Sequence, residues 1–207
     1  MTTQAQNNAA TLIGCLVTND ENSEFLFSHE VNGEKFYSFT LEVERISNTK
    51  DCIPIIVSER LIDKNHTYAD MPLCVEGQFR SYNKKSETKV HQILYFFAQH
   101  IYPIDEPHMN EICINGFVCK EPIYRTTPFG REITDLMLAV PRLCGKTDYI
   151  PCICWGRNAI FASSFPVGTQ VQIAGRIQSR EYTKIIDNIA EIRTAYEISA
   201  NQICCGE

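Results

Sequence analysis

The chain of 207 residues contains an internal repeat. Four short segments of its first half recur in the same order in its second half, displaced by about 100 residues. The paired segments are 13–17 with 114–118, 51–55 with 148–152, 75–79 with 173–177, and 98–101 with 200–203. Because each copy has the length of a small domain, we predict two homologous domains. They span residues 12–103 and 111–205, and residues 104–110 form the linker.

Each copy has the residue pattern of short β-strands around one helix. In residues 171–177, apolar residues alternate with polar or small ones, as expected of a strand with one buried face. A helix-compatible stretch follows the third strand-like run of each copy, at residues 59–68 and 157–165. Glycines inside the predicted strands, such as Gly77 and Gly175, fit the tight bends of a small barrel. Five strands with a short helix after the third is the order of an OB-fold barrel, so the predicted fold class is all-β with two tandem OB-fold barrels.

Composition excludes several classes of protein. Hydrophobic residues make up 44% of the chain and charged residues 21%, which is typical of folded domains and unlike disordered chains. No apolar run approaches the roughly 18 residues needed to cross a bilayer. The polar N-terminus, residues 1–11, lacks the apolar stretch of a secretory signal. We therefore expect a cytoplasmic protein with no membrane role.

The ten cysteines have no spacing that indicates a disulfide framework or a zinc site. There is no Cys-x-x-Cys, and the five histidines are scattered over residues 29–108 without metal-ligand spacing. Cys152 and Cys154 alternate onto one face of a predicted strand, and we expect both to be small buried residues in a reducing compartment. The alternatives are a zinc ligand or a cysteine nucleophile. We expect no metal, no cofactor and no enzymatic activity.

The net charge of −6 is unevenly distributed along the chain. Residues 1–106 carry 9 Lys and Arg against 15 Asp and Glu, whereas the remaining residues carry 10 of each, and 7 of those 10 cations are Arg. The acidity therefore belongs to the first half. A basic stripe in the second half remains compatible with binding of nucleic acid.

The second copy contains a series of ordered motifs. They are Asn115-Gly116, Glu121-Pro122, and the segments 125–130 (RTTPFG), 138–140 (LAV), 148–157 (DYIPCICWGR), 168–171 (GTQV) and 175–182 (GRIQSREY). Together they make residues 112–203 similar to the bacterial and phage single-stranded DNA-binding protein family, here in a tandem OB-fold variant. The first copy resembles that family only through the second copy. The resemblance implies sequence-tolerant binding and protection of single-stranded DNA in replication, recombination or repair.

A sequence-tolerant binder of single strands needs aromatic rings for the bases and cations for the phosphates on one surface. Strand alternation predicts two shared faces. One holds Tyr149, Ile153, Trp155 and Arg157, and the other holds Arg176, Gln178, Arg180 and Tyr182. In the family that this copy resembles, the positions matching Tyr149, Trp155 and Tyr182 carry base-stacking aromatics, and the alternative for each is a core position. The candidates in the second copy are Tyr149, Trp155, Tyr182, Arg176, Arg180, Arg157, the turn residues Arg125, Phe129 and Arg131, and the loop residues Arg142 and Lys146.

The first copy departs from this pattern. Cys52 and Ser58 stand where the second copy has an aromatic residue, so the stacking surface of that strand is missing. The candidates that it keeps on one face are Arg80, Tyr82 and Lys84. Two roles stay open for this domain, namely weaker nucleic-acid binding or pairing between subunits through Tyr37, Tyr95, Phe96 and Phe97.

The expected partner is single-stranded DNA, bound by a protein associated with the nucleoid. Two alternatives remain: a primosome-type or phage-type OB protein that acts by protein interaction at replication forks, and an RNA-binding OB module. We expect a homodimer, because the family commonly presents four OB domains and a two-domain chain reaches four by pairing once. The last residues, 202–207, do not form the acidic tail through which the family recruits partners, so we expect no recruitment by such a tail.

Overall fold

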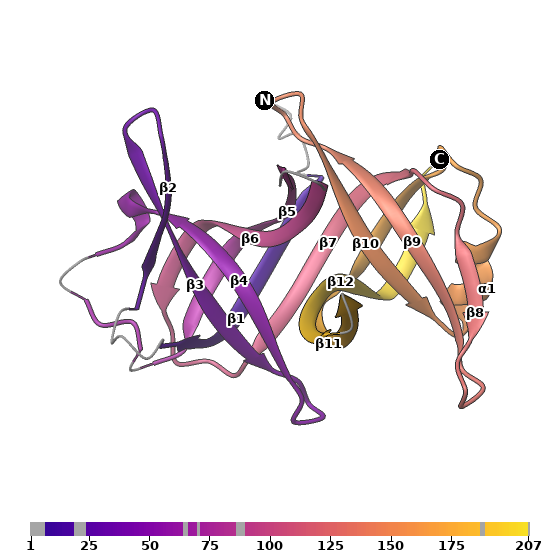
Figure 1. The fold of residues 1–207 in the computed structure, drawn as a ribbon, viewed down its shortest axis with the longest axis horizontal. Coiled ribbons are helices and arrows are strands. Elements are labelled where there is room, and N and C mark those ends of the chain that lie inside the picture. The colour runs from indigo at the N-terminus through magenta and orange to yellow at the C-terminus, as the bar shows by residue number, and fades with distance from the viewer. Residues whose placement is uncertain are drawn as a thin grey trace.

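The computed structural model describes residues 7–18, 24–63, 66–69, 71–85, 90–186 and 189–206. Its strands form one continuous 12-stranded sheet in the order β2-β3-β4-β6-β5-β1-β7-β11-β12-β10-β9-β8. The two halves of this sheet curl into two barrels that lie side by side (Figure 1). No helix in these described ranges is long and apolar enough to span a membrane.

The first barrel closes because one strand pairs on both of its edges. Its elements are β1 (Asn8–Val17), β2 (Leu26–Val31), β3 (Glu34–Glu44), β4 (Lys50–Ser58), the 3-10 helix η1 (Glu59–Leu61), β5 (Leu73–Lys85) and β6 (Val90–Pro103). Strand β1 pairs with β3 and β5, and β4 pairs in parallel with β6. The inward-facing side chains, among them Leu12, Leu41 and Phe79, are fully buried and fill the barrel.

The second barrel repeats this topology. Its elements are β7 (Met109–Val118), β8 (Ile123–Thr126), β9 (Glu132–Pro141), β10 (Thr147–Trp155), α1 (Arg157–Ser163), β11 (Gln170–Ile186) and β12 (Ile189–Cys205). Strand β7 pairs with β9 and β11, and β10 pairs in parallel with β12. The predicted all-β class with two tandem OB-fold barrels is confirmed.

Two features of the barrels differ from the sequence pattern. Each barrel has an additional short strand, β2 or β8, in which every residue is exposed, so that no apolar alternation reveals it. The described part of the helix expected over residues 59–68 forms only the single turn η1, because the backbone returns to an extended conformation at Ile62; residues 64 and 65 lie outside the described residues. In the second barrel α1 forms as expected and buries Ala159 and Ala162.

Two strand glycines permit a close crossing of strands. A Cβ atom on Gly77 would lie 2.1 Å from the carbonyl oxygen of Phe97, and one on Gly175 would lie 2.2 Å from that of Ser199. Both glycines stand at a register shift of the ladder, where the long hairpins β5–β6 and β11–β12 bend. Any larger residue would push the paired strands apart.

The barrels are joined through antiparallel pairing of β1 with β7, over six residue pairs from Asn8 and Ile114 to Ile13 and Met109. A buried aspartate reinforces the contact on each side. Asp148 pairs with Arg142 of its own barrel and accepts the backbone N–H of Ser81 from the other barrel at 2.6 Å. Asp51 repeats the arrangement with Arg45 and with the N–H of Ser179, at 2.8 Å. We call these two contacts the Asp148 junction and the Asp51 junction.

Removing either buried carboxylate charge will destabilise the protein. Asp51→Asn or Asp148→Asn leaves a half-buried guanidinium without its ionic partner, and we expect a loss of roughly 3 to 5 kcal/mol in the free energy of unfolding. Asp135→Asn is the matched control, because its ion pair with Arg125 is partly exposed and contributes at most about 1 kcal/mol. Urea unfolding followed by circular dichroism measures all three variants. Equal losses for buried and exposed positions would contradict the assignment.

Candidate nucleic-acid interface

A groove on the second barrel brings together three of the predicted residues, Arg131, Trp155 and Arg176. The pairing of β9 with β10 sets Trp155 opposite Ile133, which is two residues after Arg131. Arg176 lies opposite Ser199 of β12, and Ser199 is next to Ile153 of β10. The groove has a volume of about 470 Å³ and is completed by Asn158, Ser199, Ala200 and Asn201.

Trp155 is the last residue of β10 and is 38% exposed, so it is not a core residue. After it, Gly156 adopts φ 55° and turns the chain into α1, which keeps the indole at the rim of the barrel. Arg131 follows a tight turn in which Gly130 has φ 75°. The two turns therefore place an aromatic side chain and a guanidinium along one opening, which Glu132 also lines.

Arg176 supplies the groove with an incompletely paired cation. Among the described residues, its Nε has no hydrogen-bond partner although the atom is buried. Burial lowers the pKa of Arg176, and the nearby charge of Arg45 lowers it further. A partly desolvated guanidinium with a free donor favours an anionic ligand.

The remaining aromatic and cationic candidates of β10 and β11 are exposed but lie outside this groove. Tyr149 is 45% exposed and stands at the other end of β10, where its N–H donates to Ser81 Oγ of the first barrel at 2.9 Å. Tyr182 and Arg180 lie on the outer arm of β11, and Tyr182 is 39% exposed. Arg180 forms no ion pair with any residue that the structure describes.

The prediction that Arg157 shares a strand face with Tyr149 and Trp155 is wrong. Strand β10 ends at Trp155, so Arg157 is the first residue of α1 and no longer follows strand alternation. Ile153 has the outward-facing parity of Tyr149 and Trp155 but is buried, because the parallel pairing of β10 with β12 closes the barrel at that residue. Arg157 itself is exposed.

Two of the predicted loop cations are engaged in ion pairs. Arg125 pairs with Asp135 at 2.8 Å on the surface, and Arg142 is held by buried Asp148 and by the Ser81 carbonyl oxygen. Arg142 therefore joins the barrels, and its bound donors are not free for a phosphate. Lys146 is exposed in the same loop, and Phe129 is 93% exposed at the tip of the β8–β9 turn.

The candidates of the first barrel lie on β5 beside other aromatic rings. The Arg80 guanidinium stacks over the ring of Phe97 at 4.0 Å, and the rings of Tyr82 and Tyr95 meet edge to face at 5.5 Å. Lys84 is exposed further along the strand. Phe96, which we expected in a surface for subunit pairing, is fully buried in the core and is excluded from such a surface.

The β2–β3 hairpin carries a group of aromatic residues of which sequence analysis named only Tyr37. His29 stacks on Phe36 with ring centroids 4.9 Å apart, and Phe27 meets Tyr37 at 6.1 Å. The signal was available, because Asn32-Gly33 is a typical hairpin turn and these aromatics flank it. Asn32 and Gly33 both have positive φ, as such a turn requires.

The cysteines do not form a metal site in the part of the chain that the structure describes, where no cluster of three His, Cys, Asp or Glu side chains occurs. Cys152 and Cys154 are buried, as expected. Burial raises the pKa of Cys154 to about 12 and that of Cys152 well above its ordinary value. Neither thiol is therefore a thiolate near neutral pH.

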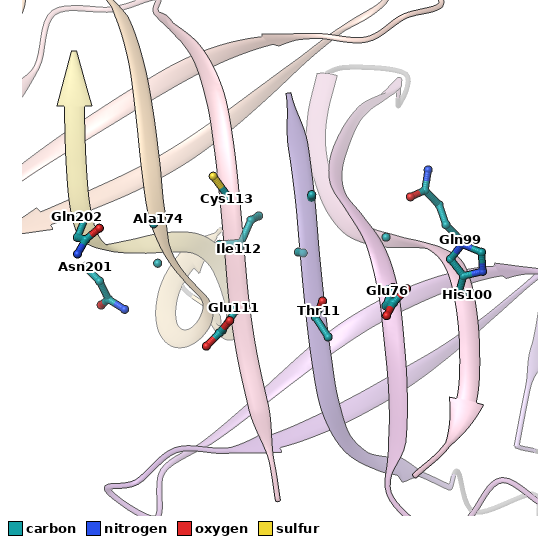
Figure 2. Close-up of a pocket in the computed structure, with 14 residues that line it drawn as sticks. Thr11, Glu76, Gln99, His100, Glu111, Ile112, Cys113, Ala174, Asn201 and Gln202 are labelled. Carbon is teal, nitrogen blue, oxygen red and sulfur yellow. The ribbon is translucent and has the colours of Figure 1, made fainter. Parts of the chain in front are cut away.

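A wide hollow of about 650 Å³ spans both barrels where β5, β1, β7 and β11 run side by side (Figure 2). Gln99 and His100 from β6 lie at one side of it, and Asn201 and Gln202 from β12 at the other (Figure 2). Glu76 and Glu111 also line it. These carboxylates oppose phosphate binding, so the hollow is not part of the candidate interface.

Comparisons with known proteins find sequence similarity over the second barrel. Residues 109–205 match the model of the Single-strand binding protein family. Single-stranded DNA-binding protein 2 of Listeria innocua is 33% identical over 81 residues, which are 36% of this chain and 51% of that protein. Single-stranded DNA-binding protein 1 of Staphylococcus aureus is 32% identical over 81 residues, 36% of this chain and 48% of that protein. The chain thus spans about half the length of these curated relatives.

A solved structure extends the similarity in fold to the whole chain. The crystal structure of wild-type single-stranded DNA binding protein from Thermus aquaticus superposes with a TM-score of 0.74 and 19% identity. The match covers 97% of this chain and 93% of that one. At this identity the comparison establishes the shared fold of both barrels.

Thiol reactivity will separate the buried cysteines from Cys144. The backbone N–H of Lys146 and the charge of Arg142 lower the pKa of exposed Cys144, so its thiolate fraction at neutral pH is raised. We expect the native chain to be alkylated at Cys144 at lower pH than the urea-unfolded chain, and Cys152 and Cys154 to be protected until unfolding. Iodoacetamide labelling between about pH 6 and pH 9 with peptide mass spectrometry measures this. Labelling of Cys154 in the native chain would contradict it.

Proposed function

We propose that this protein binds and protects single-stranded DNA without sequence preference, because residues 109–205 match the model of the Single-strand binding protein family. The observation that carries the proposal is the groove of Arg131, Trp155 and Arg176, which lies in the half of the chain that matches the family. The protein acts by binding alone, in replication, recombination or repair.

The groove has the chemical parts that such binding needs. Every base has an aromatic face, so stacking on Trp155 tolerates any sequence and contributes about 1 to 3 kcal/mol per base. Arg131 and Arg176 flank the indole and neutralise phosphates of the same strand, which releases counterions. Arg180 and Tyr182 extend the surface along β11 with a second cation and a second ring.

Loss of the indole tests the proposal directly. Trp155→Ala is expected to weaken binding of oligothymidine by about 5- to 150-fold, because one stacking contact of about 1 to 3 kcal/mol is lost. Phe161→Ala is the matched control, since Phe161 is an aromatic of α1 that is 48% exposed and lies outside the groove. Fluorescence anisotropy with labelled oligonucleotides, at one fixed salt concentration, gives both affinities.

The same assay distinguishes the other candidate functions. Tighter binding of oligouridine than of oligothymidine would indicate an RNA-binding module. No binding of either by the folded wild-type chain would indicate an OB protein that acts through protein contacts, and would refute the proposed function. Equal affinities of Trp155→Ala and wild type would remove the groove from the binding surface.

We further propose that the chain forms a homodimer, which brings four barrels together. The hollow of Figure 2 is the candidate face, because it spans both barrels and is opposite in character to the cationic groove. Light scattering is expected to give twice the 23.6 kDa of one chain. Thr11→Arg, in this hollow, is expected to shift the mass toward one chain, whereas Trp155→Ala is not. A single-chain mass for the wild type at all working concentrations would contradict the dimer.

A further inference from the structure

The groove at Trp155 has a structural counterpart on the first barrel. Strand pairing fixes the correspondence, since Trp155 lies opposite Ile133 and, at the same place in the first barrel, Ser58 lies opposite Phe36. The pairing of β11 with β12 matches that of β5 with β6 in the same way. The groove residues Arg131, Trp155, Arg176 and Ser199 therefore correspond to Glu34, Ser58, Gln78 and Phe97, which we call the counterpart site.

The counterpart site and its neighbours carry less positive charge than the groove. In the second barrel, residues 131, 132, 155–157 and 176 include three arginines and one glutamate. The corresponding residues 34, 35, 58–60 and 78 of the first barrel include two glutamates, one lysine and one arginine. The lysine, Lys35, lies opposite Glu30 of β2. The first barrel thus has no net positive charge at the place where the second barrel attracts a phosphate.

Glu34 is fixed in the counterpart site by two side chains. Ser58 Oγ donates a hydrogen bond to the Glu34 carboxylate, and the Arg60 guanidinium lies 3.3 Å from that carboxylate. The Glu34 side chain is 25% exposed, so a ligand at the surface can approach it. A carboxylate therefore stands where the second barrel has the guanidinium of Arg131, and it repels a phosphate.

The aromatic rings of this region have partners within the chain. The Arg80 guanidinium covers one face of Phe97 at 4.0 Å, and its Nε and Nη2 both donate to Gln78 Oε1, at 3.0 and 2.7 Å. Phe36 stacks on His29, with centroids 4.9 Å apart and ring planes 9° apart. A base that stacks on either of these covered faces must first displace a contact that already exists.

We infer that Glu34 excludes single-stranded DNA from the first barrel at the counterpart site. The carboxylate in place of Arg131 repels the phosphate, and Ser58 in place of Trp155 offers the base no ring. One chain therefore has one tight site for a strand too short to reach a second barrel. This inference rests on the proposed function and identifies the residue that makes the two barrels differ in it.

The number of short strands bound per chain tests the inference. An oligothymidine of about 10 nucleotides has the length that one OB barrel covers. Titration calorimetry, at a protein concentration well above the Kd, is expected to give one tightly bound strand per wild-type chain. Two strands bound with equal affinity would overturn the inference. No binding of any strand would refute the proposed function instead, so the two failures are distinct.

Reversing the charge of Glu34 is expected to create a phosphate contact on the first barrel. The substitution is made in the Trp155→Ala chain, so that binding by the second barrel is weakened. Glu34→Arg is expected to raise the affinity for the same oligothymidine about three- to tenfold, and to steepen its dependence on salt by about 0.7 log units per log unit.

Glu30→Arg is the matched control, because it makes the same change of charge at an exposed residue of the same hairpin. We expect it to raise the affinity by less than about twofold, since an exposed charge outside the site is screened by salt. Equal gains from the two substitutions, or no gain from Glu34→Arg, would overturn the inference.

Glu34→Gln tests the same residue with less disturbance of the fold. The amide oxygen of glutamine still accepts the Ser58 hydroxyl, so that only the charge is lost. We expect a rise in affinity of about two- to threefold, against no change for Glu30→Gln. Circular dichroism compares the fold of all four variants with that of the parent chain. A folded Glu34→Gln chain with the affinity of its parent would also overturn the inference.

Discussion

The antiparallel pairing of β1 with β7 is the contact on which the rest of the structure depends. It merges two closed barrels into one sheet and fixes the angle at which they meet. The ladder is supported at both ends by the same device, since Asn8 exchanges two hydrogen bonds with the backbone of Phe79 and Asn110 does so with Ile177. The two buried aspartates then tie the barrels together on either side of the ladder. Without this pairing, the grooves and rings of the two barrels would have no defined relation to one another.

On this symmetric frame the two copies have become chemically different. Residues that form the frame correspond one to one: Asp51 with Asp148, Arg45 with Arg142, Ser81 with Ser179 and Gly77 with Gly175. Residues that face outward do not, as Tyr149 against Cys52 and Tyr95 against Glu197 illustrate. Frame residues are constrained by burial and by hydrogen bonds to a neighbouring backbone, whereas exposed positions tolerate a change of charge or size at little cost in stability. The exposed surface is therefore asymmetric although the fold is not.

Much of the fold was predictable from the sequence, because an internal repeat with period-two alternation leaves few alternatives to paired small barrels. The additional strands β2 and β8 were not, since fully exposed residues carry no alternation. The sequence indicated the candidate residues one by one but not the groove that three of them line. Trp155, Arg131 and Arg176 converge only because β12 inserts between β11 and β10, a pairing that no local pattern encodes. The ion pairs of Arg125 and Arg142 likewise depend on partners that the sequence does not identify. Arg157 does not lie on the predicted strand face, because β10 ends at Trp155 and Gly156 turns the chain into α1.

Because a linker joins β6 to β7, pairing of the two barrels does not depend on the protein concentration. Two barrels on separate chains would separate on dilution, whereas two barrels on one chain face each other at a fixed effective concentration however scarce the protein is. Their pairing is thus an intramolecular equilibrium, set by the ladder of β1 and β7 and by the buried aspartates alone. A covalent connection also means that each substitution occurs once per pair of barrels. A single glutamate or tyrosine can then make the two barrels chemically different. In a symmetric pair of identical chains, one substitution would change both barrels alike.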